Sequence, residues 1–322
     1  MARIAIVGAN GLVGAKLTEI LADKLPYHKL MLFGKTSAGQ KINCFGKSHT
    51  IESLNGLPEC DYAMFMANEA VAKEYVPKLA ERGTVCVDNS SAFRMHKGVP
   101  LVVPQINGET VGCGKIIANP NCTTIQVAIA LAAMKSLKPK KVTVVTLQSV
   151  SGAGKDGLDD LTEKRVYGKL KCFSHPIHDN VLAQIGDALP DGTTTEEQKL
   201  KRELPKILEI PTLHVNAFCV RVPVTVGHCA FVNVSFEEKF NVAQVRNMLK
   251  NTKDVLLFDD AENNVFPMPQ VLRHTHFVGV GRLCLDEEGG LNMFVVADNL
   301  LRGAAYNAYQ ILKIAMKNNG DE

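Results

Sequence analysis

The segment RIAIVGANGLVGAKLTEILADK, residues 3–24, carries the strongest fold signal in this chain of 322 residues. A β-branched run leads into a glycine-rich turn, and a helical pattern of apolar residues follows. Such a turn brings the amides of a helix N-terminus within reach of a dinucleotide pyrophosphate; the alternative is a purely structural turn. The turn residues that we expect to contact a dinucleotide are Gly8, Asn10, Gly11, Leu12, Val13 and Gly14.

Beyond this first unit, short apolar runs alternate with helical segments. The runs KLMLF, YAMFMA, GTVCVDNS and PLVVPQ are typical of strands, and EAVAKEYVPKLAERG has helical spacing and a terminal glycine. This alternation predicts an α/β fold with a Rossmann-like, doubly wound parallel sheet through about residue 120.

The remainder of the chain has a different pattern. Longer alternating strands such as HCAFVNVSFEE follow residue 140, and the EEGG turn at 287–290 predicts a hairpin. Together with helices at 123–137 and 196–208, these strands predict an α+β domain with a mixed sheet. The last segment, from residue 300, is typical of one long amphipathic helix, and its periodicity does not say where it docks.

Charge and cysteine content exclude several classes of protein. The formal net charge is +3, from 36 basic and 33 acidic residues scattered along the chain, so we expect no nucleic-acid or membrane partner. The nine cysteines have irregular spacing and no CxxC pair, which argues against a disulfide framework and a zinc site. Neither a signal peptide nor a membrane span of about 20 apolar residues is indicated. We therefore expect a cytoplasmic protein without a metal ion.

The loop LFGKTSAGQK, residues 32–41, bears on the choice of cofactor. Dinucleotide folds that bind NAD usually place an acid here to accept the ribose hydroxyls. This loop instead offers Lys35, Thr36 and Ser37 and no acid. A cation and two hydroxyls suit a 2′-phosphate, so the loop favours NADP over NAD; the alternative is a solvated polar loop.

One cysteine differs from the other eight in its surroundings. In ANPNCTTIQ, residues 118–126, Cys122 precedes an apolar helical run. If the helix begins at Thr123, the helix dipole and unpaired amides stabilise a thiolate at this position. For the other cysteines, a buried small apolar side chain is the better interpretation.

A thiolate nucleophile needs a partner that handles protons. The stretch RVPVTVGH offers Arg221 and His228, whose odd separation would point them to opposite faces of a continuous strand. A bend at Pro223 or Gly227 is required to bring them to one pocket. The spacing alone does not decide this.

Eight motifs occur in the order and approximate spacing of aspartate-semialdehyde dehydrogenase, which the chain resembles over nearly its whole length. They are GANGLVG, DNSSAFR, ANPNCTTIQ, QSVSGAG, EEQK with a later E, RVPV with a later GH, FVGVGR and ADNLLRGAA. The resemblance implies a homodimeric or homotetrameric enzyme. It implies an NADP-binding domain at 1–121, completed by the C-terminal helix at 300–322, and a catalytic and dimerisation domain at 122–299.

The resemblance also implies a reaction and its residues. The enzyme would reduce L-4-aspartyl phosphate to L-aspartate 4-semialdehyde with NADPH, in the biosynthesis of lysine, threonine and methionine. Cys122 corresponds to the nucleophile, Gln148 to its orienting neighbour and His228 to the general acid/base. Arg221 corresponds to the residue that binds the substrate α-carboxylate, and Glu196 to the one that binds its amino group.

Further residues are implied to bind phosphate or cofactor. The phosphate ligands implied are Arg94, Asn121 and Lys199. The further cofactor contacts implied are Ser151, Gly152 and Asn299.

The chain departs from the family pattern at three places. Thr36 replaces an arginine that usually clamps the 2′-phosphate, so either Lys35 compensates or NAD is tolerated. Gln105 stands where glutamate is frequent, and the sequence offers no physical account of the change. His175 and His178 occupy a commonly more apolar segment, but no further ligands accompany them, so we do not expect a metal site.

Two related enzymes and one different class are the alternatives. N-acetyl-glutamyl-phosphate reductase typically has glycine in place of Asn121, and its acylated substrate gives no reason for Glu196. Glyceraldehyde-3-phosphate dehydrogenase also has two threonines after its nucleophile, but its other motifs are missing. A non-catalytic dinucleotide-binding regulator would have little reason to keep Cys122, Gln148, Arg221 and His228 together.

Overall fold

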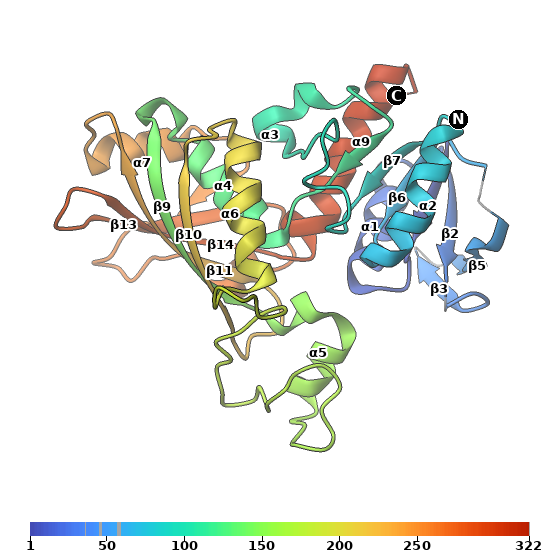
Figure 1. The fold of residues 1–322 in the computed structure, drawn as a ribbon, viewed down its shortest axis with the longest axis horizontal. Helices are drawn as coiled ribbons and strands as arrows, with labels where there is room; N and C mark the ends of the chain where they lie inside the picture. The colour runs from blue at the N-terminus through green and yellow to red at the C-terminus, as the bar shows by residue number, and fades with distance from the viewer. Residues whose placement is uncertain (36, 45–46, 57–58, 322) are drawn as a thin grey trace. The chain divides into compact units, whose positions relative to one another are not determined.

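The computed structural model describes residues 1–35, 37–44, 47–56 and 59–321 (Figure 1). The chain divides into two compact units. The first comprises Met1–Pro120 with Ala304–Glu322, and the second comprises Asn121–Gly303.

In its described part, the first unit contains a parallel sheet in the order β5-β2-β1-β6-β7-β8 and a separate antiparallel pair, β3 and β4. The strands are β1 (Arg3–Val7), β2 (Lys29–Gly34), β3 (Lys41–Cys44), β4 (Lys47–Thr50), β5 (Glu52–Ser53), β6 (Tyr62–Phe65), β7 (Val85–Asp88) and β8 (Ile116–Ala118). The helices are α1 (Leu12–Lys24), α2 (Glu69–Glu81), α3 (Pro104–Asn107) and α9 (Tyr306–Asn319), with short 3-10 turns at Leu54–Gly56 and Gly108–Thr110.

Both faces of this parallel sheet are buried. In β1, Ile4 and Ile6 pack into a core that includes residues of α1 and α9, whereas Ala5 and Val7 pack into a second core with α2. Successive side chains of a strand point to opposite faces, so the apolar run of β1 serves two helical layers. The predicted Rossmann-like doubly wound sheet is confirmed.

One predicted strand of this unit is wrong. The segment PLVVPQ forms only an isolated bridge, between Leu101 and Ala118, and α3 begins at Pro104. Proline has no N–H to give to a strand ladder, and its fixed φ suits the first turn of a helix. The outer strand is β8, whose short apolar run the sequence pattern did not single out.

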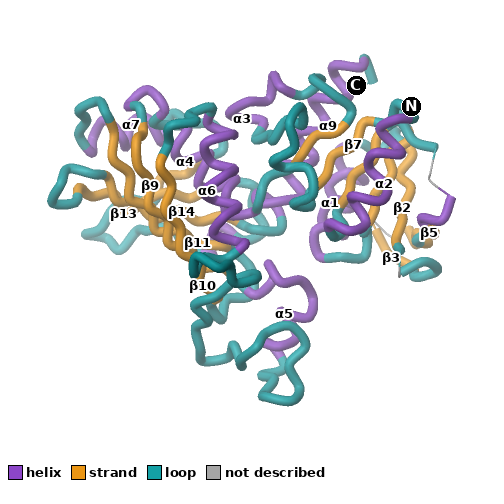
Figure 2. The backbone as a smooth tube through the Cα atoms, in the orientation of Figure 1, coloured by secondary structure: helices purple, strands orange, loops and turns teal. Residues whose placement is uncertain are grey.

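The second unit, which is described throughout, contains a mixed sheet in the order β10-β9-β11-β14-β13-β12 (Figure 2). Its strands are β9 (Pro139–Gln148), β10 (His214–Arg221), β11 (His228–Phe236), β12 (Val255–Leu257), β13 (Val278–Leu285) and β14 (Leu291–Ala297). Its helices are α4 (Cys122–Ala132), α5 (Gly154–Thr162), α6 (Thr195–Leu208), α7 (Val242–Lys250) and α8 (Pro269–Leu272), with 3-10 turns at Lys135–Leu137 and Val150–Ala153. The predicted mixed sheet is confirmed, as is the hairpin, which joins β13 to β14.

The two faces of the mixed sheet differ. Helices α4 and α6 pack on one face (Figure 1). On the other face, the strand register aligns Phe218, Val145, Phe231 and Phe294 across four neighbouring strands. The side chains of Phe218 and Phe231 are 50% and 38% exposed. An apolar row therefore crosses the face that the two helices leave open.

Three local features refine the sequence predictions. Helix α4 begins at Cys122, one residue earlier than predicted. The chain bends between β10 and β11, with Gly227 at a φ of 104°, a conformation that favours glycine. The C-terminal segment is not one α-helix: a π-helical turn, Leu301–Ala305, precedes α9.

Candidate active site

The candidate nucleophile, Cys122, is the first residue of α4 and is half-buried. Asn121 caps the helix, because its Oδ1 accepts hydrogen bonds from the amides of Thr123 at 3.0 Å and Thr124 at 3.3 Å. These bonds satisfy two of the donors that a helix start leaves unpaired. A Cβ built on Gly303 would lie 2.9 Å from the Cys122 Cβ. The cysteine thus begins a capped helix and packs directly against a glycine.

Three of the predicted site residues donate hydrogen bonds to a fourth, the buried carboxylate of Glu196 on α6. Its Oε1 accepts from Asn121 Nδ2 at 2.9 Å and Gln148 Nε2 at 3.1 Å, and its Oε2 accepts from Lys199 Nζ at 2.8 Å. Burial alone would raise the pKa of the Glu196 carboxyl. The charge of Lys199 and the three hydrogen bonds outweigh burial and lower the pKa from 4.5 to about 2. Glu196 is therefore ionised at neutral pH.

His228, at the start of β11, is fully buried and neutral. Its Nδ1 accepts the backbone N–H of Ser149 at 3.0 Å, and an amide N–H can only donate. The proton of the neutral ring therefore lies on Nε2. Burial, followed by the charge of Arg221, lowers the pKa of His228 from 6.5 to about 3, although Glu196 acts in the opposite direction.

The Nε2 atom of His228 is buried and has no hydrogen-bond partner among the residues that the structure describes. Leaving a buried donor unsatisfied costs about 1–3 kcal/mol. Such a group in a native fold calls for an explanation, and a functional role is one of the few available. The Nε2–H is therefore a candidate donor to a ligand oxygen.

Arg221, the last residue of β10, is a buried cation beside these groups. Its Nη1 donates to the carbonyl oxygen of Ser149 at 2.8 Å, and its guanidinium lies 5.8 Å from the centroid of the Phe173 ring. Burial lowers the pKa of Arg221, whereas Glu196 and Cys122 act in the opposite direction. Arg221 is thus close enough to both groups to interact with them electrostatically.

Hydrogen bonds fix the turn that follows β9. Asn299 Oδ1 accepts from the Ser149 hydroxyl at 3.0 Å and from the Gly227 amide at 2.9 Å, and Asn299 Nδ2 donates to Ser151 Oγ at 3.0 Å. The predicted cofactor contacts Asn299 and Ser151 therefore bind each other. Sequence reasoning misses Ser149, although it lies inside the QSVSGAG motif and contacts both His228 and Arg221.

Gly152, another predicted cofactor contact, leaves no room for a side chain. A Cβ at this position would lie 2.9 Å from Arg221 Nη1 and 3.1 Å from His228 Nε2. The backbone at Gly152 therefore packs directly against the side chains of Arg221 and His228.

The first unit holds a cavity of about 240 Å³ at the carboxyl ends of β1, β2 and β6. Here the strand order reverses, since β1 lies between β2 and β6, and open α/β sheets bind ligands at such switch points. The predicted residues that line the cavity are Gly8, Asn10, Gly11, Lys35 and Ser37. Sequence reasoning misses the other lining residues, Val7, Gly34, Leu54, Met66, Ala67, Asn68 and Val71.

The glycines of the turn are sterically required. Gly8 has a φ of 84°, and a Cβ on it would lie 2.5 Å from the carbonyl oxygen of Met66. A Cβ on Gly14 would collide with the Gly8 carbonyl oxygen. The predicted residues Leu12 and Val13 begin α1. A backbone cradle that side chains would fill fits a dinucleotide pyrophosphate.

The predicted 2′-phosphate loop is described in part. Lys35 Nζ pairs with Glu74 Oε2 at 3.0 Å, and the two side chains are 54% and 42% exposed. Ser37 is buried, and a Cβ built on Gly34 would collide with its hydroxyl. Thr36 lies outside the described residues.

The predicted phosphate ligand Arg94 belongs to the first unit. Its side chain is buried, with Nε donating to the carbonyl oxygen of Asn119 at 3.0 Å and Nη2 to that of Asn89 at 2.8 Å. In the same unit, Gln105 Nε2 donates to Gln310 Oε1 at 2.9 Å. A glutamate at position 105 could not donate this bond.

Of the two additional histidines, His175 has a hydrogen-bond partner, whereas Nδ1 of His178 has none among the described residues. His175 Nδ1 lies 2.8 Å from the Tyr167 hydroxyl, and His178 Nδ1 lies 3.7 Å from Asp179 Oδ2. Within the described ranges, no three His, Cys, Asp or Glu side chains gather as metal ligands. No helix in that part of the chain has the length and apolar character needed to cross a membrane.

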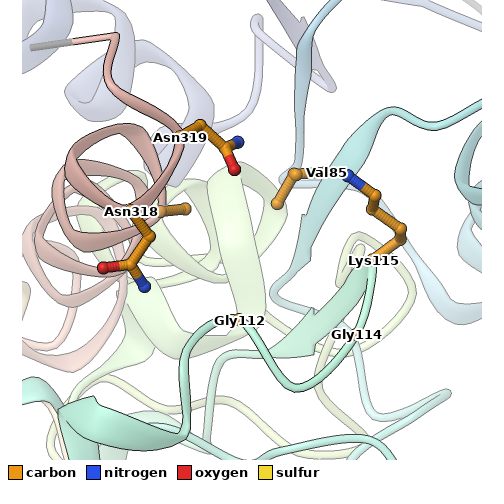
Figure 3. Close-up of a pocket in the computed structure, with 7 residues that line it drawn as sticks. Val85, Gly112, Gly114, Lys115, Asn318 and Asn319 are labelled. Atoms are coloured by element: carbon orange, nitrogen blue, oxygen red, sulfur yellow. The ribbon is translucent and has the colours of Figure 1, made fainter.

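A smaller cavity, of about 150 Å³, lies elsewhere in the first unit (Figure 3). It is lined by Val85, Gly112, Gly114, Lys115, Ala315, Asn318 and Asn319. None of these is a predicted site residue, so this cavity is separate from the glycine turn.

Two family models match the chain. The semialdehyde dehydrogenase NAD binding domain matches residues 3–112, and the semialdehyde dehydrogenase dimerisation domain matches residues 130–302. The switch-point cavity falls in the first match, and most of the polar site falls in the second. Fold and site together thus define a semialdehyde dehydrogenase.

Comparison with individual proteins identifies the family within this class. The aspartate-semialdehyde dehydrogenase of Aquifex aeolicus is 40% identical, and that of Bacillus subtilis is 36% identical, with 98% of both chains covered in each case. The crystal structure of aspartate semialdehyde dehydrogenase II from Vibrio cholerae superposes with a TM-score of 0.93 at 35% identity, covering 99% of each chain; a second such structure is described as complexed with ASA. The chain belongs to the aspartate-semialdehyde dehydrogenase family, as its motifs predicted.

Proposed function

We propose that this chain catalyses the NADP-dependent reductive dephosphorylation of L-4-aspartyl phosphate to L-aspartate 4-semialdehyde through a thioester on Cys122. The observation that carries the proposal is a buried guanidinium, that of Arg221, which interacts electrostatically with both Cys122 and the ionised Glu196, beside a neutral imidazole whose Nε2 has no partner among the described residues. The reaction would serve the biosynthesis of lysine, threonine and methionine.

The charges of the site match those of an aspartyl group. The Glu196 carboxylate accepts the substrate ammonium, and the planar Arg221 guanidinium binds the α-carboxylate through two hydrogen bonds. Lys199, Asn121 and Arg94 are the proposed phosphate ligands. Gln148 holds Glu196 in place, which orients the substrate relative to the thiol.

The chemistry proceeds through Cys122. Its thiolate attacks the acyl carbon, the bond from that carbon to the phosphate oxygen breaks, and phosphate leaves a thioester behind. A nicotinamide dinucleotide held at the glycine turn of Gly8 and Gly11 would supply the hydride that reduces the thioester. The thiohemiacetal oxyanion then re-forms a carbonyl as the carbon–sulfur bond breaks, which releases the aldehyde and restores the thiolate. Negative charge develops on the same oxygen in both stages, so that oxygen needs a donor.

We propose His228 Nε2–H as this donor. The helix amides of Thr123 and Thr124 already donate to Asn121, so they are not the first choice for the oxyanion. Because Ser149 holds the proton of the neutral ring on Nε2, the imidazole acts at that atom as a hydrogen-bond donor to the oxyanion, and it does not deprotonate the thiol from there.

The preference for NADP rests on Lys35. An exposed ion pair such as that with Glu74 contributes only about 0–1 kcal/mol, so a 2′-phosphate can replace the carboxylate. Substituting Lys35→Ala is expected to lower the ratio of kcat/KM for NADP to that for NAD by about tenfold. An unchanged ratio would contradict the role of Lys35.

The reverse reaction tests the proposal directly. L-aspartate semialdehyde, phosphate and either NADP or NAD are mixed with the wild-type protein or with Cys122→Ser, and the absorbance of the reduced cofactor is followed. We expect phosphate-dependent NADPH formation that Cys122→Ser abolishes. If NADH forms faster than NADPH, only the proposed preference for NADP is wrong. A wild-type protein that binds a dinucleotide but stays inert would favour a regulator instead.

We also propose a homodimer. The apolar row formed by Phe218, Val145, Phe231 and Phe294 lies within the match to the dimerisation domain, and a second copy of this chain is the proposed occupant. Phe231→Glu is expected to shift the sedimentation profile from dimer to monomer. A dimer that persists would place the interface elsewhere.

A cytoplasmic location is proposed from the cysteines. Nine cysteines with irregular spacing are typical of a chain that works in a reducing compartment.

A further inference from the structure

Glu203 of α6 is a buried carboxylate that the proposed mechanism does not use. Its side chain is 1% exposed, and its Oε2 accepts the backbone N–H of Asn121 at 2.7 Å. Asn121 lies 82 positions earlier in the chain and immediately precedes Cys122. A buried carboxylate is costly unless it is hydrogen-bonded, so this contact needs a reason.

The reason lies in the way that helices are capped. The N–H of the cap residue is one of the donors that a helix start leaves unpaired. In a capping box, the side chain three positions later accepts it, as Glu197 accepts the Thr194 N–H at 2.8 Å at the start of α6. Helix α4 has Thr124 at the corresponding position, where neither glutamate nor glutamine is available. Glu203 supplies the missing acceptor from another helix.

Glu203 and Glu196 hold Asn121 together. They are seven positions apart, nearly two helical turns, so they lie on the same side of α6. Glu196 accepts from the side-chain amide of Asn121 and Glu203 from its backbone amide. Asn121, the residue before Cys122, is therefore held by hydrogen bonds to two glutamates of α6.

We propose that Glu203 is a positioning residue for the nucleophile: it holds the Asn121 amide and thereby fixes the start of α4 and the place of Cys122. The inference rests on the proposed role of Cys122. The carboxylate also carries negative charge to a helix N-terminus, where it disfavours a neighbouring thiolate. Position and charge can be separated, because glutamine keeps the acceptor without the charge and alanine removes both.

The test compares Glu203→Gln and Glu203→Ala with a matched control, Glu197→Gln, which alters a buried carboxylate of the same helix that does not bind Asn121. One readout is the rate of Cys122 alkylation by iodoacetamide as a function of pH, followed by mass spectrometry of the Cys122 peptide. The other is kcat and KM in the phosphate-dependent reverse reaction. Circular dichroism establishes that each variant is folded.

We expect Glu203→Ala to lower kcat by about tenfold or more while KM changes by less than about threefold, since small misplacements of a reacting group cost rates of this size. Glu203→Gln should recover most of this loss and shift the alkylation midpoint of Cys122 to lower pH by about one unit. The control should leave the midpoint where it is in the wild type.

Three results would overturn the inference: a wild-type kcat in Glu203→Ala, equal losses of kcat in both variants with an unchanged midpoint, or the same midpoint shift in the control. Should Glu203→Ala fail to fold, Glu203→Met, which fills similar space without an oxygen acceptor, takes its place, and a wild-type kcat in that variant would overturn the proposal. Because alkylation needs no substrate, an inert wild-type enzyme would refute the proposed function and leave this test intact.

Discussion

Replacing Glu196 by glutamine should remove a large part of the pH dependence of stability in acid. Burial opposes ionisation of this carboxyl, but Lys199 and the amide donors prevail and lower its pKa from 4.5 to about 2. That difference corresponds to about 3 kcal/mol in the free energy of unfolding. Because the folded state has the lower pKa, this stabilisation is fully present above about pH 4.5 and is lost as the pH falls toward about 2. About 2 kcal/mol is lost by about pH 3.

Urea unfolding between about pH 7 and about pH 3 measures this effect. The difference in unfolding free energy between wild type and Glu196→Gln should shrink by about 2 kcal/mol over this range. A companion variant, Lys199→Met, removes the main ionic partner and raises the folded-state pKa of Glu196, so it should make the loss of stability in acid smaller. If the wild-type and Glu196→Gln curves stay parallel down to about pH 3, Lys199 and the amide donors do not hold the carboxyl ionised.

Three further predictions follow from close contacts and from burial. Gly303→Ala adds a methyl group 2.9 Å from the Cys122 Cβ, so it should lower kcat by about tenfold while circular dichroism shows a retained fold. Full activity would mean that the start of α4 shifts to accommodate the methyl group without displacing Cys122. Gly152→Ala intrudes on Arg221, and calorimetry should show at least about tenfold weaker binding of aspartate semialdehyde; unchanged binding would contradict this crowding. His228 should show no titration by NMR between about pH 5 and 8, because burial and then the charge of Arg221 lower its pKa to about 3; a midpoint near 6.5 would be inconsistent with this environment.

The sequence predicted those features that depend on local pattern. The glycine turn at Gly8 is recognisable because a strand and a helix flank it, and the EEGG hairpin is recognisable because alternating runs lie on both sides. The start of α4 was predicted within one residue, since an apolar run with helical spacing follows Cys122. By contrast, PLVVPQ imitates a strand in its apolar content, and its prolines prevent a ladder from forming.

Features that depend on contacts between distant residues could not be read from the pattern. Ser149 looks like an ordinary loop serine, and only the bend between β10 and β11 brings His228 Nδ1 to its amide. The ion pair between Lys35 and Glu74 joins residues 39 positions apart, and periodicity carries no information about it. Glu203 lies within a recognisable motif, yet its bond to Asn121 becomes visible only when α6 packs beside α4.

The start of α4 depends on an acceptor, Glu203, that is synthesised much later than Cys122. A chain emerging from the ribosome contains Cys122 long before it contains Glu203, so the cap of α4 is incomplete until the later helix has been made and has docked. Until then the short helix lacks tertiary support, and isolated helices of this length are marginal in water. The thiol acquires its fixed geometry only in the finished fold.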